Sequence, residues 1–332
     1  MDTDLLRARL RTAGTLALGA TAAGGAALVY GSVIERNLFK VREETLPILP
    51  AGRGPLRILH LSDIHMTPGQ TLKQRWLRQL ASLEPDLVVN TGDNLSHHQA
   101  VQPLVDALAP LLDVPGVFVP GSNDYYSPVM KNPFSYLTGP SSQPKDYAER
   151  ELPWREMHAA FGTAGWIDLT NRHQSVVVDR VRLDFTGVDD PHLQRDRYSG
   201  FPNGSTSADE AAFLRIAVAH APYQRVLDRF AADDADLMLA GHTHGGQVRL
   251  PGYGALTSNC DLPTWRARGL TYWEHERRSV PLNVSAGLGT SRLAPVRFAC
   301  RPEAVLLTLT PAAPAGEVPA EGRRTGPGPG LS

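Results

Sequence analysis

Cysteine is scarce in this chain, and its spacing rules out two kinds of site. The 332 residues contain two cysteines, Cys260 and Cys300, and neither belongs to a C-x-x-C pair. A zinc ribbon and a thioredoxin-like redox site both need such a pair, so both are excluded. If the domain is exported, the two cysteines could form one disulfide. The alternative is that each serves as a small apolar residue.

The chain also lacks an excess of charge of either sign. It has 33 Lys and Arg against 34 Asp and Glu, which gives a net charge of −1 at pH 7. Nucleic-acid-binding domains usually carry a basic stripe, so no nucleic-acid partner is expected. Hydrophobic residues make up 42% of the chain, enough to bury a sizeable core. The length is typical of one large domain or two small ones.

Charged residues are absent from one N-terminal stretch, which runs from Thr12 to Ile34. Its length suits a single membrane crossing, for which roughly 20 residues are needed. Three interpretations remain open: an uncleaved membrane anchor, which we favour, a cleaved signal peptide, and a soluble alanine-rich helix. No Arg-Arg pair precedes the stretch, so a twin-arginine signal is not indicated.

Basic residues flank this stretch on both sides, so its orientation is weakly specified. Three arginines before it favour a cytoplasmic N-terminus, and Arg36, Lys40 and Arg42 after it oppose that orientation. We expect a single-pass protein of the cell membrane with the main domain on the outer face. The expected segments are an anchor or signal segment with a linker (1–50), a folded domain (51–312) and a disordered tail rich in Pro, Gly and Ala (313–332).

The middle of the chain alternates short apolar runs with helical spacing. Strands are expected within 56–63, 85–93, 116–121, 174–190 (a hairpin), 214–222, 235–247, 281–289 and 303–310, and helices within 71–83, 100–112 and 223–232. The βαβαβ order of the first part indicates an α/β layered fold. Open α/β sheets place ligands beyond the carboxyl ends of their strands.

Five polar stretches follow these expected strands. They are Asp63-Ile64-His65, Gly92-Asp93-Asn94, Gly121-Ser122-Asn123-Asp124, Ala219-His220-Ala221 and Gly241-His242-Thr243-His244. In an extended segment, residues i and i+2 point the same way, so the outer members of the first and last stretches are expected to face one point. Carboxylate oxygen combined with imidazole nitrogen suits Zn2+, Mn2+ or Fe better than Mg2+ alone.

These stretches resemble the motifs of the calcineurin-like metallophosphoesterase superfamily: D-x-H, G-D-x-x, G-N-H-[D/E], a lone H and G-H-x-H. Four of the five match in order, within about residues 57–310. The run G-H-T-H-G-G-Q (241–247) is most similar to membrane-associated or exported phosphodiesterases. The resemblance implies an α/β fold in four layers, α-β-β-α, in which two packed sheets carry helices on their outer faces.

The resemblance also implies a centre of two divalent metal ions, Mn2+, Zn2+ or Fe. By position, Asp63, His65 and His244 hold one ion, Asp93 bridges both, and His220, His242 and the Asn of the third motif hold the other. The ions would clamp a phosphate and activate a hydroxide that attacks phosphorus in line with the leaving group. Because the ions lower the pKa of water, no separate strong base is needed.

The third motif departs from the family pattern, and two alignments are open. Without a gap, Ser122 replaces the ligand Asn and Asn123 replaces the His. With a slip of one residue, Asn123 is the ligand and Asp124 follows it in the His position. We favour the slip, because an Asn carbonyl is a competent metal ligand and a neutral Ser hydroxyl is a poor one. In both alignments the His is missing.

The missing His normally contacts phosphate or protonates the leaving group, a contribution typically worth about 10²–10⁴-fold. We take Asn123, Asp124 and His97 as candidate catalytic residues in its place. Further candidates are His98 and Tyr125, although a loop His is often just exposed and a loop Tyr is often a packing residue. Asn94 either orients a ligand or caps its loop.

The expected function is hydrolysis of a phosphodiester or pyrophosphate bond. The N-terminal segment makes a lipid-linked or envelope phosphate substrate an expectation from location rather than from pocket residues. The alternative is a catalytically degenerate metal-binding module that acts in envelope assembly or signalling, which the altered third motif favours. The substrate, the native metals and the oligomeric state are not determined by the sequence.

Overall fold

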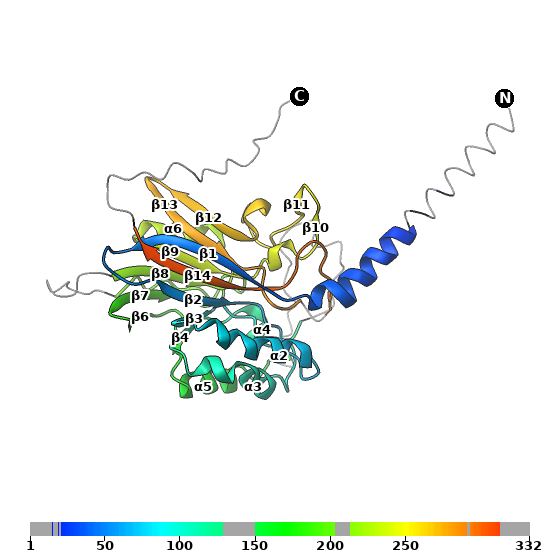
Figure 1. The fold of residues 1–332 in the computed structure, drawn as a ribbon, viewed down its shortest axis with the longest axis horizontal. Helices are drawn as coiled ribbons and strands as arrows, with labels where there is room; N and C mark the ends of the chain where they lie inside the picture. Colours follow the sequence, from blue (N-terminus) through cyan, green and yellow to red (C-terminus); the bar gives the residue numbers. More distant parts are fainter. Residues whose placement is uncertain are drawn as a thin grey trace, which may run out of the picture.

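Two stacked six-stranded sheets form the centre of the protein. The computed structural model describes Thr15, Gly19 and residues 21–128, 150–202, 213–290 and 293–312 (Figure 1). The first sheet has the order β1 (Lys40–Leu49), β14 (Glu303–Pro311), β2 (Leu56–Leu61), β3 (Leu87–Asn90), β4 (Gly116–Phe118) and β5 (Ile167–Asp168). The second has the order β12 (Gly269–His275), β13 (Arg278–Val284), β9 (Leu237–Ala240), β8 (Phe213–Ala219), β7 (Val181–Gly187) and β6 (His173–Val178).

Apolar residues on alternate positions of the strands build the core between the two sheets. Ile58 of β2 and Val89 of β3 face Leu183, Ile216 and other residues of the second sheet in one buried cluster. Their neighbours along β2 and β3 point to the opposite face, against helices. Because β2 and β3 are covered on both faces, most of their residues are apolar on both sides instead of alternating with polar ones.

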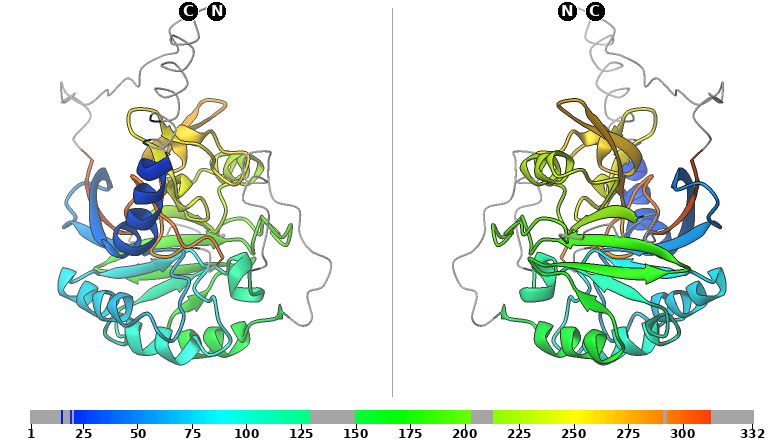
Figure 2. Two further views of the ribbon diagram at one scale, coloured as in Figure 1. Left: turned by 90° about the vertical axis from the view of Figure 1, so that its right-hand side faces the viewer. Right: turned by 90° about the vertical axis from the view of Figure 1, so that its left-hand side faces the viewer.

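Helices cover the outer face of each sheet. The first sheet packs against α2 (Thr71–Gln79), α3 (Val101–Leu112) and α5 (Trp154–Thr163), and the second packs against α6 (Gln224–Ala232). The views in Figure 2 show the helices below and above the paired sheets. The predicted four-layer α-β-β-α sandwich is therefore confirmed. Of these helices, α5 is the one that the sequence analysis did not anticipate.

Strand β1 begins before the boundary that the sequence predicted. Residues up to 50 were assigned to an anchor and linker, but Lys40–Leu49 pair in parallel with β14 along the edge of the first sheet. The assignment failed because this strand is rich in charge (KVREETLPIL), which is typical of sheet edges and masks the apolar signal.

The buried carboxylate of Glu303 connects β1 to the strand beside it and to the segment that leads into the second sheet. Glu303 of β14 is fully buried and accepts hydrogen bonds from Arg42 Nε (3.0 Å) and from Arg268 Nη2. Burial by itself would raise the pKa of Glu303, but the charges of Arg42 and Arg268 outweigh it and hold the pKa below its ordinary value of 4.5. The same Arg42 reaches across to Asn283 of β13, with 2.9 Å between Nη2 and Oδ1.

We predict that Glu303→Gln lowers the free energy of unfolding at pH 7 by about 3 kcal/mol, because it removes the buried charge that pairs with the partly buried Arg42 and Arg268. The depressed pKa means that the stabilisation is present above the ordinary pKa and is lost as pH falls through the folded value. The difference from wild type should therefore shrink below about pH 4. Urea unfolding at several pH values measures it, with the exposed Glu43→Gln on β1 as control. A difference independent of pH would contradict the assignment.

The structure bears on the predictions for the N-terminal segment, the C-terminal tail and the cysteines. Within the described residues, no helix combines the length and apolar character that a membrane crossing requires. The C-terminal tail from residue 313 and most of the 127–142 insertion lie outside the described residues.

Cys260 and Cys300 are both free, so the disulfide alternative is wrong and the small-residue interpretation holds.

Candidate metal centre

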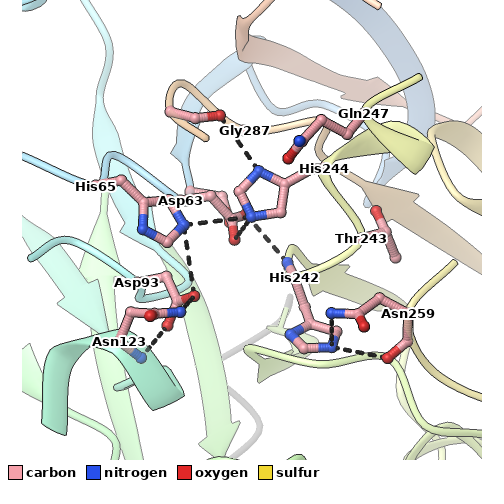
Figure 3. Close-up of polar contacts among 12 residues, drawn as sticks. Asp63, His65, Asp93, Asn123, His242, Thr243, His244, Gln247, Asn259 and Gly287 are labelled. Atoms are coloured by element: carbon pink, nitrogen blue, oxygen red, sulfur yellow. Dashed lines mark hydrogen bonds and ion pairs between the residues drawn. The ribbon is translucent and has the colours of Figure 1, made fainter. Parts of the chain in front are cut away.

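The polar stretches converge where the strands of the two sheets end. β2 and β3 lead into the loops that carry Asp63 and Asp93, and β9 leads into the loop that carries His242 and His244. Figure 3 shows these side chains directed toward one another from both sheets. The predicted gathering of the motifs is confirmed as a placement, and their roles as metal ligands remain a proposal.

The backbone of these loops is not extended, which corrects the predicted geometry. Five of the candidate ligands have positive φ angles: Asp63 (49°), His65 (46°), Asp93 (55°), His242 (68°) and His244 (50°). The strands stop at Leu61 and Ala240, before the motifs begin. The left-handed conformation is unfavourable for non-glycine residues and persists where surrounding structure enforces it. The side chains converge because the loops are bent, and not because residues i and i+2 share a strand face.

Four side chains form the tightest cluster. Asp63, His65, Asp93 and His244 each offer a ligand atom, and these atoms all lie within 4.8 Å of one another. His65 Nε2 lies 3.2 Å from His244 Nε2 and 3.6 Å from Asp93 Oδ2. Because these two Nε2 atoms are only 3.2 Å apart, they cannot both carry a proton that points at the other ring. A cation that accepts the lone pairs of both nitrogens would fit this arrangement.

The carboxylate of Asp63 gives the strongest indication of a cation. Its Oδ2 accepts from Ser62 Oγ (2.5 Å) and from the His242 amide (3.0 Å). Its Oδ1 is buried and has no hydrogen-bond partner among the described residues; His244 Nε2 is 3.6 Å away. A buried carboxylate oxygen left without a donor is costly, and a metal ion would satisfy it.

A second group of side chains lies on the other side of Asp93. His220 Nε2 is 3.4 Å from Asp93 Oδ1 and 3.3 Å from His242 Nδ1. Asn123 donates to the same carboxylate through its backbone N–H (2.7 Å, to Oδ1) and its Nδ2 (2.6 Å, to Oδ2). Asp93 therefore stands between the two groups, as expected for a bridging ligand.

The protonation states of three of the four histidines suit metal binding. Burial lowers the pKa of His65 and of His244 to about 4, and it lowers the pKa of His242 well below its ordinary range. These three rings are therefore neutral, the form that ligates metals. Burial also lowers the pKa of His220, but Asp93 outweighs it and raises that pKa well above the ordinary value. Without a metal, His220 supplies the positive charge that balances Asp93.

The third motif forms a short helix, α4 (Ser122–Tyr125), which corrects one predicted role. Asn123 reaches the site, as the slipped alignment expected. Asp124 does not take the place of the missing His: its buried carboxylate accepts from the backbone N–H groups of Gly121, Asp93, Asn94 and Leu95. Burial and the charge of Asp93 raise its pKa to about 6. Asp124 thus holds the loop that carries Asp93 and is turned away from the reaction site.

We predict that Asp124→Asn lowers the free energy of unfolding by about 3 kcal/mol, because an amide nitrogen would face backbone N–H donors in a buried site. Urea unfolding measures the change. The exposed Asp113→Asn at the end of α3 is the control and should alter stability by less than about 0.5 kcal/mol. Unchanged stability together with lost hydrolysis would instead return Asp124 to a catalytic role.

The remaining candidates for the missing His are His97, His98 and Tyr125. His97 accepts a hydrogen bond from the Gln99 amide through Nδ1 (3.0 Å) where the chain leads into α3, and His98 is exposed. Tyr125 is buried and donates to Asp189 Oδ1 (2.9 Å), and burial raises its pKa above the ordinary value. None of these contacts is with a proposed ligand, and the catalytic role of His97 stays a prediction.

The two interpretations of Asn94 are resolved in favour of the loop. Its side chain exchanges two hydrogen bonds with Asn90, at 2.8 Å and 3.1 Å. Asn90 Oδ1 also accepts from the Gly92 amide, so the pair closes the turn before Asp93.

Several residues that no sequence motif marked support the ligands. Lys73 of α2 is buried and donates from Nζ to the Ile64 carbonyl (2.6 Å), between the first two ligands; burial lowers its pKa to about 7. Arg297 is fully buried and donates to the carbonyls of Ala286, Gly287 and Gly289. Buried Lys and Arg are rare without a partner, but no sequence spacing marks them.

Three more residues surround His242. The ring of His192 lies 4.8 Å from the ring of His242, between centroids, and its Nδ1 is 3.1 Å from the Tyr223 hydroxyl. The Asn259 carbonyl lies 3.2 Å from His242 Nε2. For His192, the signal in the sequence was the polar stretch "GVDDPH" (187–192), which follows β7 as the other motifs follow their strands.

Known proteins resemble this chain over most of its length. Residues 56–246 match the calcineurin-like phosphoesterase family. The chain is 27% identical over 318 residues to "Uncharacterized metallophosphoesterase YkuE" of Bacillus subtilis (strain 168), covering 89% of this chain and 94% of that protein. It is 25% identical over 298 residues to "Phosphodiesterase YaeI" of Escherichia coli (strain K12), covering 88% and 96%. It is 30% identical over 209 residues to "Transmembrane protein with metallophosphoesterase domain" of Bos taurus, covering 60% and 43%.

The family match covers more than half of the chain. The chain therefore belongs to the calcineurin-like phosphoesterase family, and it is a phosphoric ester hydrolase. The resemblance drawn from the sequence motifs is confirmed at this level. The assignment to a membrane-associated or exported subfamily stays a prediction.

Proposed function

We propose that this hydrolase cleaves a phosphodiester or pyrophosphate bond of a lipid-linked substrate at a centre of two divalent cations. The proposed ligands of one cation are Asp63, His65 and His244, those of the other are His220, His242 and Asn123, and Asp93 bridges the two. The observation that carries the proposal is the buried Asp63 Oδ1, which lacks a hydrogen-bond donor beside neutral imidazoles. Mixed carboxylate and imidazole donors suit Mn2+, Zn2+ or Fe.

Hydrogen bonds orient the proposed ligand rings. The Nδ1 atoms of His65, His220 and His244 lie near Ser96 Oγ (3.0 Å), the Thr91 carbonyl (2.7 Å) and the Gly289 carbonyl (3.2 Å). Each ring therefore presents its Nε2 atom to the centre. Such partners fix the tautomer and direction of a ligating imidazole.

When bound, the cations would supply Lewis acidity toward the phosphate and a nucleophile at neutral pH. The protein's own residues hold this chemistry in a buried site, since Asp63, His65, Asp93 and His220 are almost fully shielded from water. Low solvent access strengthens the interaction of the centre with a charged phosphate.

The third motif sets an expectation for the leaving group. In the slipped alignment Asp124 takes the His position, and its carboxylate is held by backbone N–H groups. The neighbouring Asn123 carboxamide has no proton to give at neutral pH. Phosphates with a leaving group of low pKa need no such proton. We therefore favour aryl phosphodiesters and pyrophosphates over alkyl monoesters as substrates.

The lipid link is inferred from the N-terminal segment. The uncharged stretch from Thr12 to Ile34 precedes the folded domain, and its end is held against that domain. Its tether would place the centre near phosphates that are carried by lipids. The proposed location at the cell membrane, with the domain outside, follows from the same stretch.

The test is hydrolysis by metal-stripped full-length protein, assayed before and after addition of Mn2+ or Zn2+. A water-soluble aryl phosphodiester and a lipid pyrophosphate in detergent are the two substrates. We expect no turnover without metal and restored turnover with it on both. If about two metals per chain bind and neither substrate is cleaved, the degenerate binding module becomes the better account.

A further inference from the structure

Large apolar side chains are exposed on one end of the molecule. Eight of them lie on two segments, while others such as Val177 are exposed elsewhere. The two segments are the N-terminal helix (Leu28, Val29, Val33 and Ile34) and the ribbon region formed by β10 (Arg249–Leu250), β11 (Gly254–Ala255) and η7 (Thr264–Arg266), with Leu250, Tyr253, Leu256 and Trp265. We call the second group the rim. Tyr253 is 76% exposed and Trp265 is 62% exposed. Figures 1 and 2 show the N-terminal helix leaving the domain beside β10 and β11.

The base of the N-terminal helix is fixed rigidly to the domain. The buried Glu35 accepts from the backbone N–H groups of Ala299 (3.0 Å) and Cys300 (2.6 Å). The Gly31 carbonyl accepts from the Arg297 amide at 3.1 Å. A Cβ added at Gly31 would lie 2.6 Å from the Arg297 carbonyl oxygen, so the helix has room there for glycine alone. The helix direction is therefore set by the domain.

Phe298 connects the base of the N-terminal helix to the rim and to the segment that carries His244. Phe298 packs its ring edge on Tyr30 and bridges to Val248, and its carbonyl accepts from the Arg249 amide of β10 (2.9 Å). β10 follows within a few residues of the proposed ligand His244. The N-terminal helix, the rim and the centre thus form one continuous side of the molecule.

We propose that this side docks on a lipid bilayer, with the rim inserted among the headgroups and the metal centre held at the membrane surface. The inference deepens the proposed function and rests on it, because it assigns how a lipid-linked phosphate reaches the site. The choice of a bilayer as the docking partner follows from the chain itself. The uncharged stretch that ends at Ile34, which we propose to be a membrane anchor, leaves the domain on this side. A surface of apolar residues beside a membrane-directed segment has the bilayer as its nearest partner.

The chemistry of the rim suits the headgroup layer. Tyr and Trp present an apolar ring and a polar tip, and both are enriched at membrane interfaces. The Arg266 guanidinium lies 4.4 Å from the centroid of the Trp265 ring. Arg301 donates to the Leu38 carbonyl at the helix base and is exposed. Arginine side chains at the depth of the lipid headgroups attract anionic lipids.

Fluorescence quenching tests the docking without using activity. Full-length protein carrying Cys260→Ser is labelled at Tyr253→Cys or, as a control, at Val177→Cys, with a polarity-sensitive dye. Val177 is 69% exposed on β6, an edge strand of the second sheet. The probes are phosphatidylcholine–phosphatidylglycerol vesicles that contain a quencher lipid. We expect quenching at 253 and none at 177, although both proteins carry the same N-terminal segment.

Equal quenching at the two positions, or none at 253, would overturn the proposal. So would a doubled molar mass in light scattering with the dye at 253 already shielded before vesicles are added, because the rim would then bind a second copy. Since this readout needs no turnover, an inactive protein that still shows quenching at 253 would refute the proposed function and leave the docking standing.

A rate comparison tests the consequence for substrates. The double variant Leu250→Ser, Tyr253→Ser should lose about tenfold in hydrolysis of a vesicle-borne aryl phosphodiester lipid, because it removes two apolar anchors. Its rate on a water-soluble aryl phosphodiester should equal that of wild type. Val177→Ser should change neither rate. A loss on both substrates, or on neither, contradicts the proposal.

Discussion

Asp93→Asn is expected to abolish metal-dependent hydrolysis, with a loss of more than about a hundredfold in kcat/KM. Even the outer partners of metal ligands are worth about 10–100-fold, and Asp93 is the residue that both halves of the site share. It lies 3.6 Å from His65 Nε2 and 3.4 Å from His220 Nε2. The substitution keeps the size of the side chain and removes its charge. Steady-state rates with an aryl phosphodiester at saturating Mn2+ measure the effect.

The matched control is Asp106→Asn, an exposed aspartate on α3 that pairs with Gln102. It should leave kcat/KM within about twofold of wild type, as expected for a surface change. Bound metal, measured after gel filtration, should fall in the Asp93 variant and stay constant in the control. An Asp93→Asn protein that keeps wild-type rates and metal content would remove Asp93 from the centre.

Gly241→Ala is expected to lower activity by about a hundredfold without unfolding the protein. A Cβ at position 241 would lie 1.8 Å from Ser62 Oγ and 2.7 Å from Asp63 Oδ2, so these groups must move. A displacement of about 1 Å in a catalytic arrangement can cost about 10²-fold. The substitution thus tests whether the position of the Asp63 carboxylate matters, while every ligand is retained.

Gly162→Ala on α5 provides the control, because nothing lies within 4 Å of the added Cβ. It should keep full activity and raise the free energy of unfolding by about 0.5–1 kcal/mol, since alanine is the better helix former. Thermal unfolding and rate measurements on both variants make the comparison. A Gly241→Ala enzyme as active as wild type would mean that the Asp63 carboxylate has no strict position.

The sequence predicted the parts of the fold that depend on apolar periodicity. Strands β2, β3 and β9 are mostly apolar runs followed by polar motifs, so both their existence and the side of the sheet used for the site could be inferred. Strand β1 could not be found this way, because its charged residues are satisfied by partners far along the chain, such as Glu303.

The details of the site lay beyond sequence reasoning for a similar reason. The slip at the third motif depended on whether α4 would place Ser122 or Asn123 beside Asp93, and that is decided by backbone N–H groups that only the fold brings together. The left-handed backbone of the ligand loops is likewise imposed by packing. Lys73 and Arg297 act on carbonyls of loops distant in sequence, which no motif encodes.

The central claim is that the converged side chains form a two-cation centre around Asp93. Anomalous diffraction from crystals of full-length protein loaded with Mn2+ tests it most directly. The account predicts two peaks that flank the Asp93 carboxylate, one within bonding distance of Asp63 Oδ1 and His244 Nε2, the other near His220 and Asn123. Crystals that hold Mn2+ elsewhere, with the Asp63 and Asp93 carboxylates bound only to protein donors or water, would contradict it.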